Sequence, residues 1–134
     1  MVKPLFDTSI LVDFLGGVPE AHAELHSYED WAISIVTWIE VMASAGEPLS
    51  DATRRFLTNF EVLPIDGDVA EMAVALRKAR RLNMPDALVQ ATASVHSRLL
   101  VTLNEKIFPA KSPGVRIPYN LRLRRFAAAR RRAR

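Results

Sequence analysis

Short apolar runs alternate with segments of helical periodicity along this chain. Runs of strand length occupy residues 2–6, 31–36, 61–65 and 99–102, and a weaker run follows at 115–117. Apolar residues at three- and four-residue spacing predict helices over residues 8–15, 19–28, 37–46, 48–60, 67–82 and 83–93. Strands that alternate with helices, without hairpin signals, favour an α/β fold: a three-layer α/β/α sandwich with a central parallel sheet of four or five strands.

Length and composition limit the classes of protein to consider. A chain of 134 residues, 49% of them hydrophobic, has the size of one domain, which we place at residues 1–120. It contains no cysteine, which excludes disulfides, thiolate zinc sites and thiol catalysis and is typical of reducing compartments. No apolar run reaches the roughly 20 residues of a membrane span, so we expect a cytoplasmic protein without membrane contact.

The net charge of +3 conceals an uneven distribution of charge. Residues 121–134 form an arginine-rich tail with seven Arg and no acidic residue, which leaves 11 basic and 15 acidic side chains in residues 1–120, a formal charge of −4. Such a tail suits binding of phosphate groups or docking on an acidic surface of the protein itself or of a partner. The alternative is a frayed terminus without function.

Three carboxylates occupy similar positions relative to the predicted strands and helices. Asp7 follows the first strand, Glu40 lies in the first turn after the second strand, and Asp86 lies in the first turn of the helix that leads to the fourth strand. Each carboxylate also suits a purely structural role at a helix start. Asp7 suits a helix N-cap, Glu40 forms a capping-box pattern with Thr37, and Asp86 after Pro85 complements the positive end of a helix.

Considered together, the three acids indicate a metal site. A doubly wound parallel sheet brings the carboxyl ends of its strands to one edge, so Asp7, Glu40 and Asp86 are expected to converge there. Converging carboxylates repel one another and favour a cation, and ligands that are all oxygen suit Mg²⁺ or Mn²⁺. Such a metal activates water and stabilises phosphoryl charge, which predicts hydrolysis of phosphodiester bonds.

Three segments together resemble the PIN-domain ribonucleases, and among these the VapC-type toxins of bacterial toxin–antitoxin pairs. They are Phe-Asp-Thr-Ser-Ile-Leu-Val-Asp at 6–13, Ile-Ser-Ile-Val-Thr-Trp-Ile-Glu-Val at 33–41 and Asn-Met-Pro-Asp-Ala-Leu-Val-Gln-Ala-Thr-Ala at 83–93. The resemblance covers residues 3–118. It implies an α/β/α sandwich and a metal-dependent endoribonuclease in which Asp7, Glu40 and Asp86 match the acids of the family. It also implies a homodimer that a cognate antitoxin holds inactive.

One position departs from the family pattern. The strand at 99–102 usually leads into a motif that supplies a fourth acid, and here Ile107 stands where that Asp is expected. Asn104 can bind a metal-bound water, and Glu105 can substitute for the acid if the turn shifts its register. Two threonines complete the predicted site, since Thr8 and Thr102 would place hydroxyl groups beside the acids.

The predicted substrate is single-stranded or looped RNA. Arg77, Arg80 and Arg81 are candidates for phosphate contacts, as are Arg122, Arg124 and Arg125 in the tail, although cations near a helix end also have a structural reason. Apolar residues around Leu11, Leu15, Leu25 and Trp38 predict a dimer or antitoxin contact.

Other functions are open at this level. A degenerate PIN module without a fourth acid would act by binding RNA or protein. A phospho-receiver would use Asp66 and Lys106, but it lacks the second acid that receivers place beside Asp7. A zinc site at His22 and His26 lacks a third ligand, so we expect a solvated helix face there.

Overall fold

The structure of the chain is a computed structural model that describes residues 1–121, so the predicted tail lies outside the described residues except for Leu121. Helices and strands alternate as predicted. The strands are β1 (Pro4–Phe6), β2 (Ala32–Ser34), β3 (Glu61–Leu63), β4 (Leu99–Val101) and β5 (Val115–Arg116). The helices are α1 (Thr8–Leu15), α2 (Pro19–His26), α3 (Ile35–Ser44), the 3-10 turn η1 (Glu47–Leu49), α4 (Ser50–Leu57), α5 (Gly67–Arg80) and α6 (Met84–Val95).

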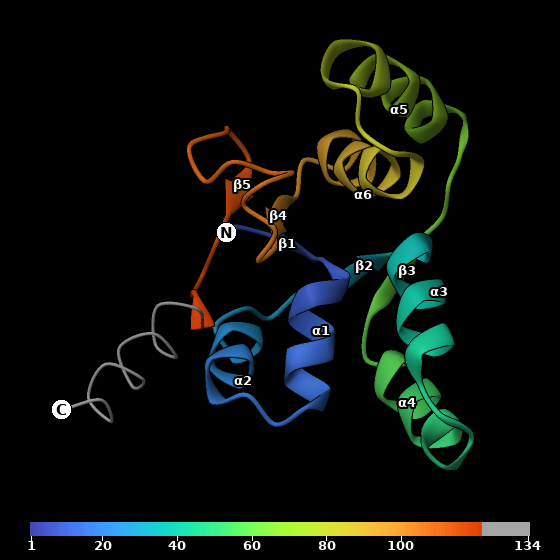
Figure 1. Cartoon of the computed structure of the whole chain (residues 1–134), viewed down its shortest axis with the longest axis vertical. Coiled ribbons are helices and arrows are strands. Elements are labelled where there is room, and N and C mark those ends of the chain that lie inside the picture. Colours follow the sequence, from blue (N-terminus) through green and yellow to red (C-terminus); the bar gives the residue numbers. More distant parts are fainter. Residues whose placement is uncertain (122–134) are drawn as a thin grey trace, which may run out of the picture.

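The strands are parallel, as predicted, and they form two hydrogen-bonded groups in the part of the chain that is described. The first group has the order β1-β4-β5 and the second pairs β2 with β3. β1 also contacts β2, so the two groups lie next to each other. In Figure 1, α5 and α6 lie on one side of the strands, α1 and α2 on the other, and α3 with α4 beside β2 and β3. The α/β fold with parallel strands is therefore confirmed.

The core lies where the apolar strands meet the apolar faces of the helices. Phe6 on β1, Leu11 on α1, Ile33 on β2 and Val101 on β4 are completely buried in one cluster. These side chains come from the strands and helices that surround the carboxyl ends of β1, β2 and β4. Packing of this cluster fixes the relative positions of the chain segments that follow those strands.

Several predicted boundaries were too wide. The strand predicted to end at Val36 ends at Ser34, because the Ser34 hydroxyl accepts a hydrogen bond from Val36 N at 3.0 Å and caps α3 two residues earlier than expected. The strand predicted over 61–65 ends at Leu63, before Pro64, which cannot donate to a strand ladder. The helix predicted from Pro48 begins as the 3-10 turn η1 and continues as α4.

One guanidinium links the two groups of strands at their amino ends. Arg98, whose side chain is 7% exposed, donates to Pro4 O at 3.0 Å, to Asp30 Oδ1 at 3.0 Å and to Glu61 Oε2 at 3.3 Å. These partners lie in β1, before β2 and in β3. The amino edge of the strands is therefore joined by charged hydrogen bonds, which are stronger than neutral ones.

Two further expectations can be compared with the described residues. No helix among them is long and apolar enough to cross a membrane. His26 on α2 is exposed, as the prediction of a solvated helix face requires. His22 instead stacks on Phe14, with ring centroids 3.9 Å apart, and its Nε2 lies 3.1 Å from Phe14 O. No group of three or more potential metal ligands occurs there or elsewhere within residues 1–121.

Candidate active site

Asp7 lies at the junction of β1 and α1, as predicted. Its backbone N–H donates to Val101 O at 2.9 Å, which extends the pairing of β1 with β4 by one bond. Its Oδ1 accepts from Thr8 N at 2.8 Å and its Oδ2 accepts from Thr102 Oγ1 at 2.6 Å. Asp7 is therefore the N-cap of α1, which is the structural role that the sequence also suggested for it. Its second carboxylate oxygen is bound by Thr102, directly after β4.

Glu40 lies in the second turn of α3, and its side chain is exposed. The capping-box alternative for Glu40 is wrong, because Ser34 caps α3 and Thr37 lies buried inside the helix. Glu40 Oε1 instead accepts from Thr8 Oγ1 at 2.7 Å, across the two chain segments. Because Thr8 directly follows Asp7 in the chain, this hydrogen bond places Glu40 close to Asp7 at the same edge of the strands.

Asp86 lies in the first turn of α6, and its carboxylate is not needed to cap this helix. Asn83 is the N-cap, and its Oδ1 accepts from Asp86 N at 3.0 Å. Pro85 follows the cap within the first turn, where a missing N–H costs nothing. The Asp86 side chain is partly buried and remains available for other contacts.

The three acids influence one another electrostatically. The pKa of Asp7 is raised mainly because burial disfavours the charged carboxylate. Hydrogen bonds from Thr102 and Thr8 offset part of this rise, and the charges of Glu40 and Asp86 add to it. The pKa of Asp86 is raised by burial and by the charge of Glu40, and its hydrogen bond with Asn83 opposes the rise. The sheet thus brings all three predicted acids within electrostatic range at one edge.

The donor atoms of this edge fit a hard divalent cation in their chemistry. Carboxylates from three segments supply oxygen without nitrogen or sulfur. A cation would offset both the burial and the mutual repulsion that raise the pKa of Asp7 and Asp86. The side chains do not close around one point, since no group of three potential metal ligands is found within residues 1–121. Asp7, Glu40 and Asp86 are the residues that would hold Mg²⁺ or Mn²⁺.

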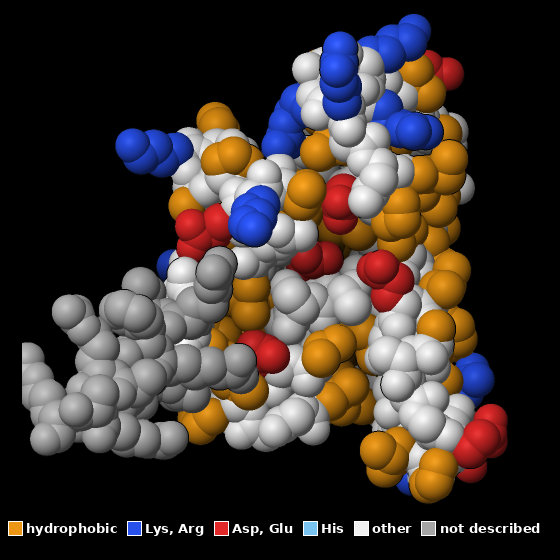
Figure 2. Space-filling model, in the orientation of Figure 1, with side chains coloured by type: hydrophobic (Ala, Val, Ile, Leu, Met, Phe, Trp, Pro, Cys, Tyr) orange, Lys and Arg blue, Asp and Glu red, His pale blue; other side chains and the backbone are white. Residues whose placement is uncertain are grey.

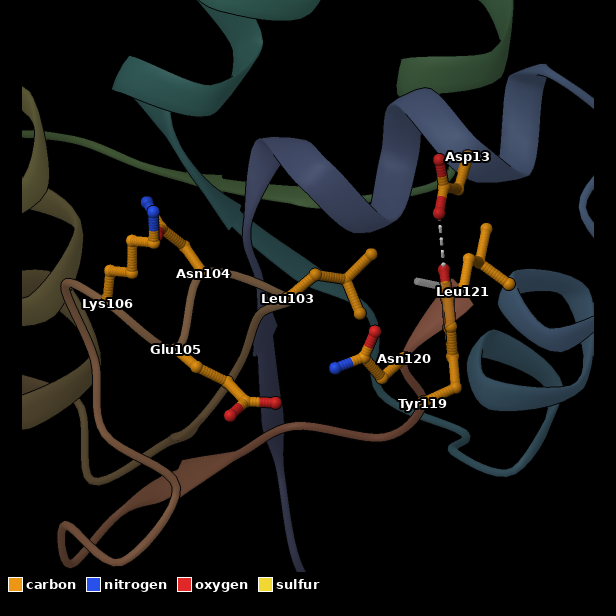
Figure 3. Close-up of a pocket in the computed structure, with 8 residues that line it drawn as sticks. All are labelled: Asp13, Leu103, Asn104, Glu105, Lys106, Tyr119, Asn120 and Leu121. Atoms are coloured by element: carbon orange, nitrogen blue, oxygen red, sulfur yellow. Dashed lines mark hydrogen bonds between the residues drawn. The ribbon is translucent and has the colours of Figure 1, made fainter. Parts of the chain in front are cut away.

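The loop after β4 carries the remaining predicted site residues. Asn104 N donates to Thr102 Oγ1 at 3.1 Å, so the same hydroxyl contacts both Asp7 and the loop. Asn104 and Glu105 are exposed, and Figure 3 shows the Glu105 carboxylate pointing away from the Asn104 amide. Ile107 packs its side chain against the core, so the position of the expected fourth acid is apolar.

A hollow of about 470 Å³ opens beside this loop. Asn104, Glu105 and Lys106 line one wall, and Asp13 and Tyr119 line another (Figure 3). Tyr119 OH donates to Asp13 Oδ2 at 3.0 Å, and the pKa of Tyr119 is raised by burial and by this carboxylate. The hollow therefore adjoins Asn104 and does not include the three acids.

The predicted RNA-binding arginines fall into three groups. Arg77 Nε donates to Leu82 O at 3.2 Å, and Arg80 donates to Gln90 and to Ile107 O, so both have partners within the protein. Arg81 ends α5 in the left-handed region, with φ of 53°. Arg122, Arg124 and Arg125 lie outside the described residues. Figure 2 shows Lys and Arg side chains concentrated over α5 and acidic side chains toward the middle of the same face.

Sequence reasoning missed two hydroxyl groups at this edge. Ser9 Oγ accepts from Leu103 N at 3.1 Å and thereby attaches the loop after β4 to α1. Thr37 Oγ1 lies 3.4 Å from Thr8 Oγ1, next to the contact between Thr8 and Glu40. A Ser two residues after an acid that caps a helix was the available signal for Ser9, whereas the buried position of Thr37 depends on where α3 begins.

Comparisons with known proteins concern the fold and the family of this chain. A chain of a toxin–antitoxin complex from Klebsiella pneumoniae is 42% identical and superposes with a TM-score of 0.83, over 88% of this chain and 99% of that one. FitAcB from Neisseria gonorrhoeae is 24% identical, with a TM-score of 0.70 over 88% of this chain and 98% of that one. VapBC2 from Rickettsia felis bound to a promoter DNA fragment is 20% identical, with a TM-score of 0.71 over 87% of this chain and 96% of that one. Both share the fold. No curated protein matches the chain. Residues 5–111 match the family model described as PIN domain, and this chain belongs to that family.

Proposed function

We propose that this protein is a metal-dependent endoribonuclease and the toxin of a toxin–antitoxin pair. The observation that carries the proposal is the proximity of Asp7, Glu40 and Asp86 at the carboxyl edge of the strands, where burial and the neighbouring carboxylates raise the pKa of Asp7 and Asp86. Membership of the PIN domain family and the likeness to chains of toxin–antitoxin complexes support it.

The side chains of this edge have separate roles in the proposed reaction. Asp7, Glu40 and Asp86 hold the cation, and Thr8 and Thr102 orient two of these carboxylates through hydrogen bonds of 2.7 Å and 2.6 Å. A bound Mg²⁺ or Mn²⁺ would supply an activated water and stabilise charge on the phosphate. Asn104, with its backbone N–H held by Thr102, presents a polar amide at the same edge and can orient a water or a phosphate oxygen.

We propose that basic side chains bind the phosphates of the RNA. Arg81 and the tail residues Arg122, Arg124 and Arg125 would bind phosphates in a way that depends on salt. Arg77 is the weaker candidate, because its Nε is already bonded to Leu82 O.

The proposed antitoxin contact lies on an apolar hollow between α1, α3 and η1. Val12, Leu15 and Leu49 line it and are 46%, 45% and 63% exposed. The sequence predicted a dimer or antitoxin contact around Leu11, Leu15, Leu25 and Trp38. This was wrong for Leu11 and Leu25, which are completely buried in the core, whereas Leu15 is exposed. A homodimer is proposed as well, and light scattering of the purified protein at dilute concentration tests it.

The decisive experiment measures cleavage of RNA by the purified protein. We expect cleavage with Mn²⁺ or Mg²⁺, none with a chelator, and none for Asp7→Asn with Mn²⁺. Glu71→Gln is the matched control, because Glu71 is an exposed carboxylate on α5 away from the three acids. Binding of RNA without cleavage, in the presence of either metal, would instead support the degenerate module that Ile107 suggests.

A further inference from the structure

Arg80 is the last residue of α5, and its guanidinium contacts two other segments of the chain. Nη1 donates to Gln90 Oε1 at 2.7 Å and Nη2 donates to the backbone carbonyl of Ile107. The planar guanidinium presents several donors in fixed directions, so it can hold two acceptors from different segments at a set separation. Arg80 therefore joins α6 to the loop after β4.

Both of these segments carry residues of the candidate site. Gln90 lies four residues after Asp86 on α6, so the two side chains project from neighbouring turns of the same helix face. Fixing Gln90 against α5 restrains the rotation and displacement of the turn that carries Asp86.

The second contact restrains the loop that carries Asn104. The carbonyl of Asn104 accepts from Ile107 N at 3.2 Å and from Phe108 N at 2.9 Å, which closes a tight turn. Arg80 holds the Ile107 carbonyl at the far end of this turn, while Thr102 Oγ1 holds Asn104 N at the near end. The turn is thus fixed at both ends, and the Thr102 hydroxyl that holds its near end also donates to Asp7.

We infer that Arg80 is a positioning residue that sets the separation of Asp86 and Asn104 at the catalytic edge, and that it does not bind RNA phosphates. The expected effect on activity rests on the proposed function. The expected effect on the placement of the two segments does not depend on it. Arg80 is exposed, like Lys78 on the same helix, and its two hydrogen bonds give it the positioning role.

The test compares two variants that each remove one positive charge from α5. Arg80→Met keeps the apolar stem and loses the donors, and Lys78→Met is the matched control because Lys78 is exposed two residues away. We expect Arg80→Met to lower kcat roughly ten-fold or more with KM nearly unchanged, since small displacements of catalytic groups reduce rate strongly. Lys78→Met should keep the kcat of the parent. Arg80→Lys, which can reach one of the two acceptors, should recover part of the lost rate.

Amide hydrogen exchange decides the structural part without any measurement of activity. Exchange at residues 104–108 should be faster in Arg80→Met than in the parent and unchanged in Lys78→Met, because loss of the contact loosens the turn. This comparison stands even if the parent does not cleave RNA, in which case the proposed function fails and the positioning role is still tested.

A double-mutant cycle identifies the partner. If Arg80 acts partly through Gln90, the combination of Arg80→Met with Gln90→Ala costs no more rate than Arg80→Met alone, whereas independent roles give multiplied losses. Equal increases in KM for Arg80→Met and Lys78→Met, with unchanged exchange at residues 104–108, would show that Arg80 is an RNA contact and overturn the inference.

Discussion

Thr102 uses one hydroxyl oxygen for two contacts, since Oγ1 donates to Asp7 Oδ2 and accepts from Asn104 N. The residue is completely buried and both hydrogen bonds are partly buried, so water replaces them only in part when the hydroxyl is removed. Thr102→Val should lower the free energy of unfolding by about 1–3 kcal/mol and reduce cleavage, because a donor and an acceptor lose their partner. Chemical denaturation measures the first effect. Thr102→Ser retains the hydroxyl and should behave almost like the parent in both assays.

The raised pKa of Asp7 gives a dependence of stability on pH. A carboxyl group whose folded pKa lies above its unfolded value favours the folded state below the unfolded pKa of 3.8 and loses this contribution as pH rises through the folded pKa. Asp7→Asn removes this loss, so without divalent metal the variant should be at least as stable as the parent at pH 7. The difference between the two should shrink toward pH 4.

Urea unfolding in the presence of chelator, at pH 4 and at pH 7, measures this difference. An Asn side chain retains an oxygen that can accept from Thr8 N, so loss of the α1 cap does not mask the effect. A variant that is clearly less stable than the parent at pH 7 would show that the hydrogen bonds of Asp7 outweigh the burial of its charge and its repulsion by Glu40 and Asp86.

At the scale of the element, different residues of the α3 region provide the helix cap and the proposed metal ligand. Ser34 caps this helix and Glu40 lies beyond its first turn, so the two functions belong to different residues. Ser34→Ala should lower the free energy of unfolding by about 1 kcal/mol. Glu40→Gln should leave stability nearly unchanged, because the amide oxygen can still accept from Thr8, and should abolish cleavage. Thermal unfolding together with the RNA assay separates the two outcomes.

Element type could be predicted from the sequence better than element ends. Apolar periodicity depends on local spacing and predicted each described helix, whereas the start of α3 depends on competition between Ser34 and Thr37 for the cap. The division of the strands into two groups could not be predicted, because pairing depends on contacts between segments that are distant in the sequence. The same holds for the partners of Arg80.

The convergence of the acids was predictable for a related reason. Asp7 and Glu40 follow strands, and parallel topology alone brings such positions to one edge. The hydroxyl groups that orient them depend on side-chain rotamers and on the exact approach of neighbouring segments. For that reason Thr8 and Thr102 were predicted beside the acids without their individual partners, and the contacts of Ser9 and Thr37 were not anticipated.

At the scale of the whole molecule, Arg98 holds together the amino ends of the two groups of strands. Arg98→Met should lower the free energy of unfolding by about 2 kcal/mol, since hydrogen bonds from a buried cation to Asp30, Glu61 and Pro4 O are lost. Lys3→Met is the control, because Lys3 is 59% exposed and lies 3.6 Å from the same Asp30. Its loss should cost well under 1 kcal/mol. Denaturant titration of the two variants and the parent makes the comparison.

The separation of β1 and β2 has a mechanical consequence. No ladder of backbone hydrogen bonds joins these two strands in the described part of the chain, and Arg98 connects the groups at the edge opposite the acids. The two groups are therefore held together by the buried side chains of Phe6, Ile33 and Val101 and by Arg98, and not by backbone pairing. The distance between Asp7 and Glu40 thus depends on side-chain contacts, including the hydrogen bond from Thr8 to Glu40.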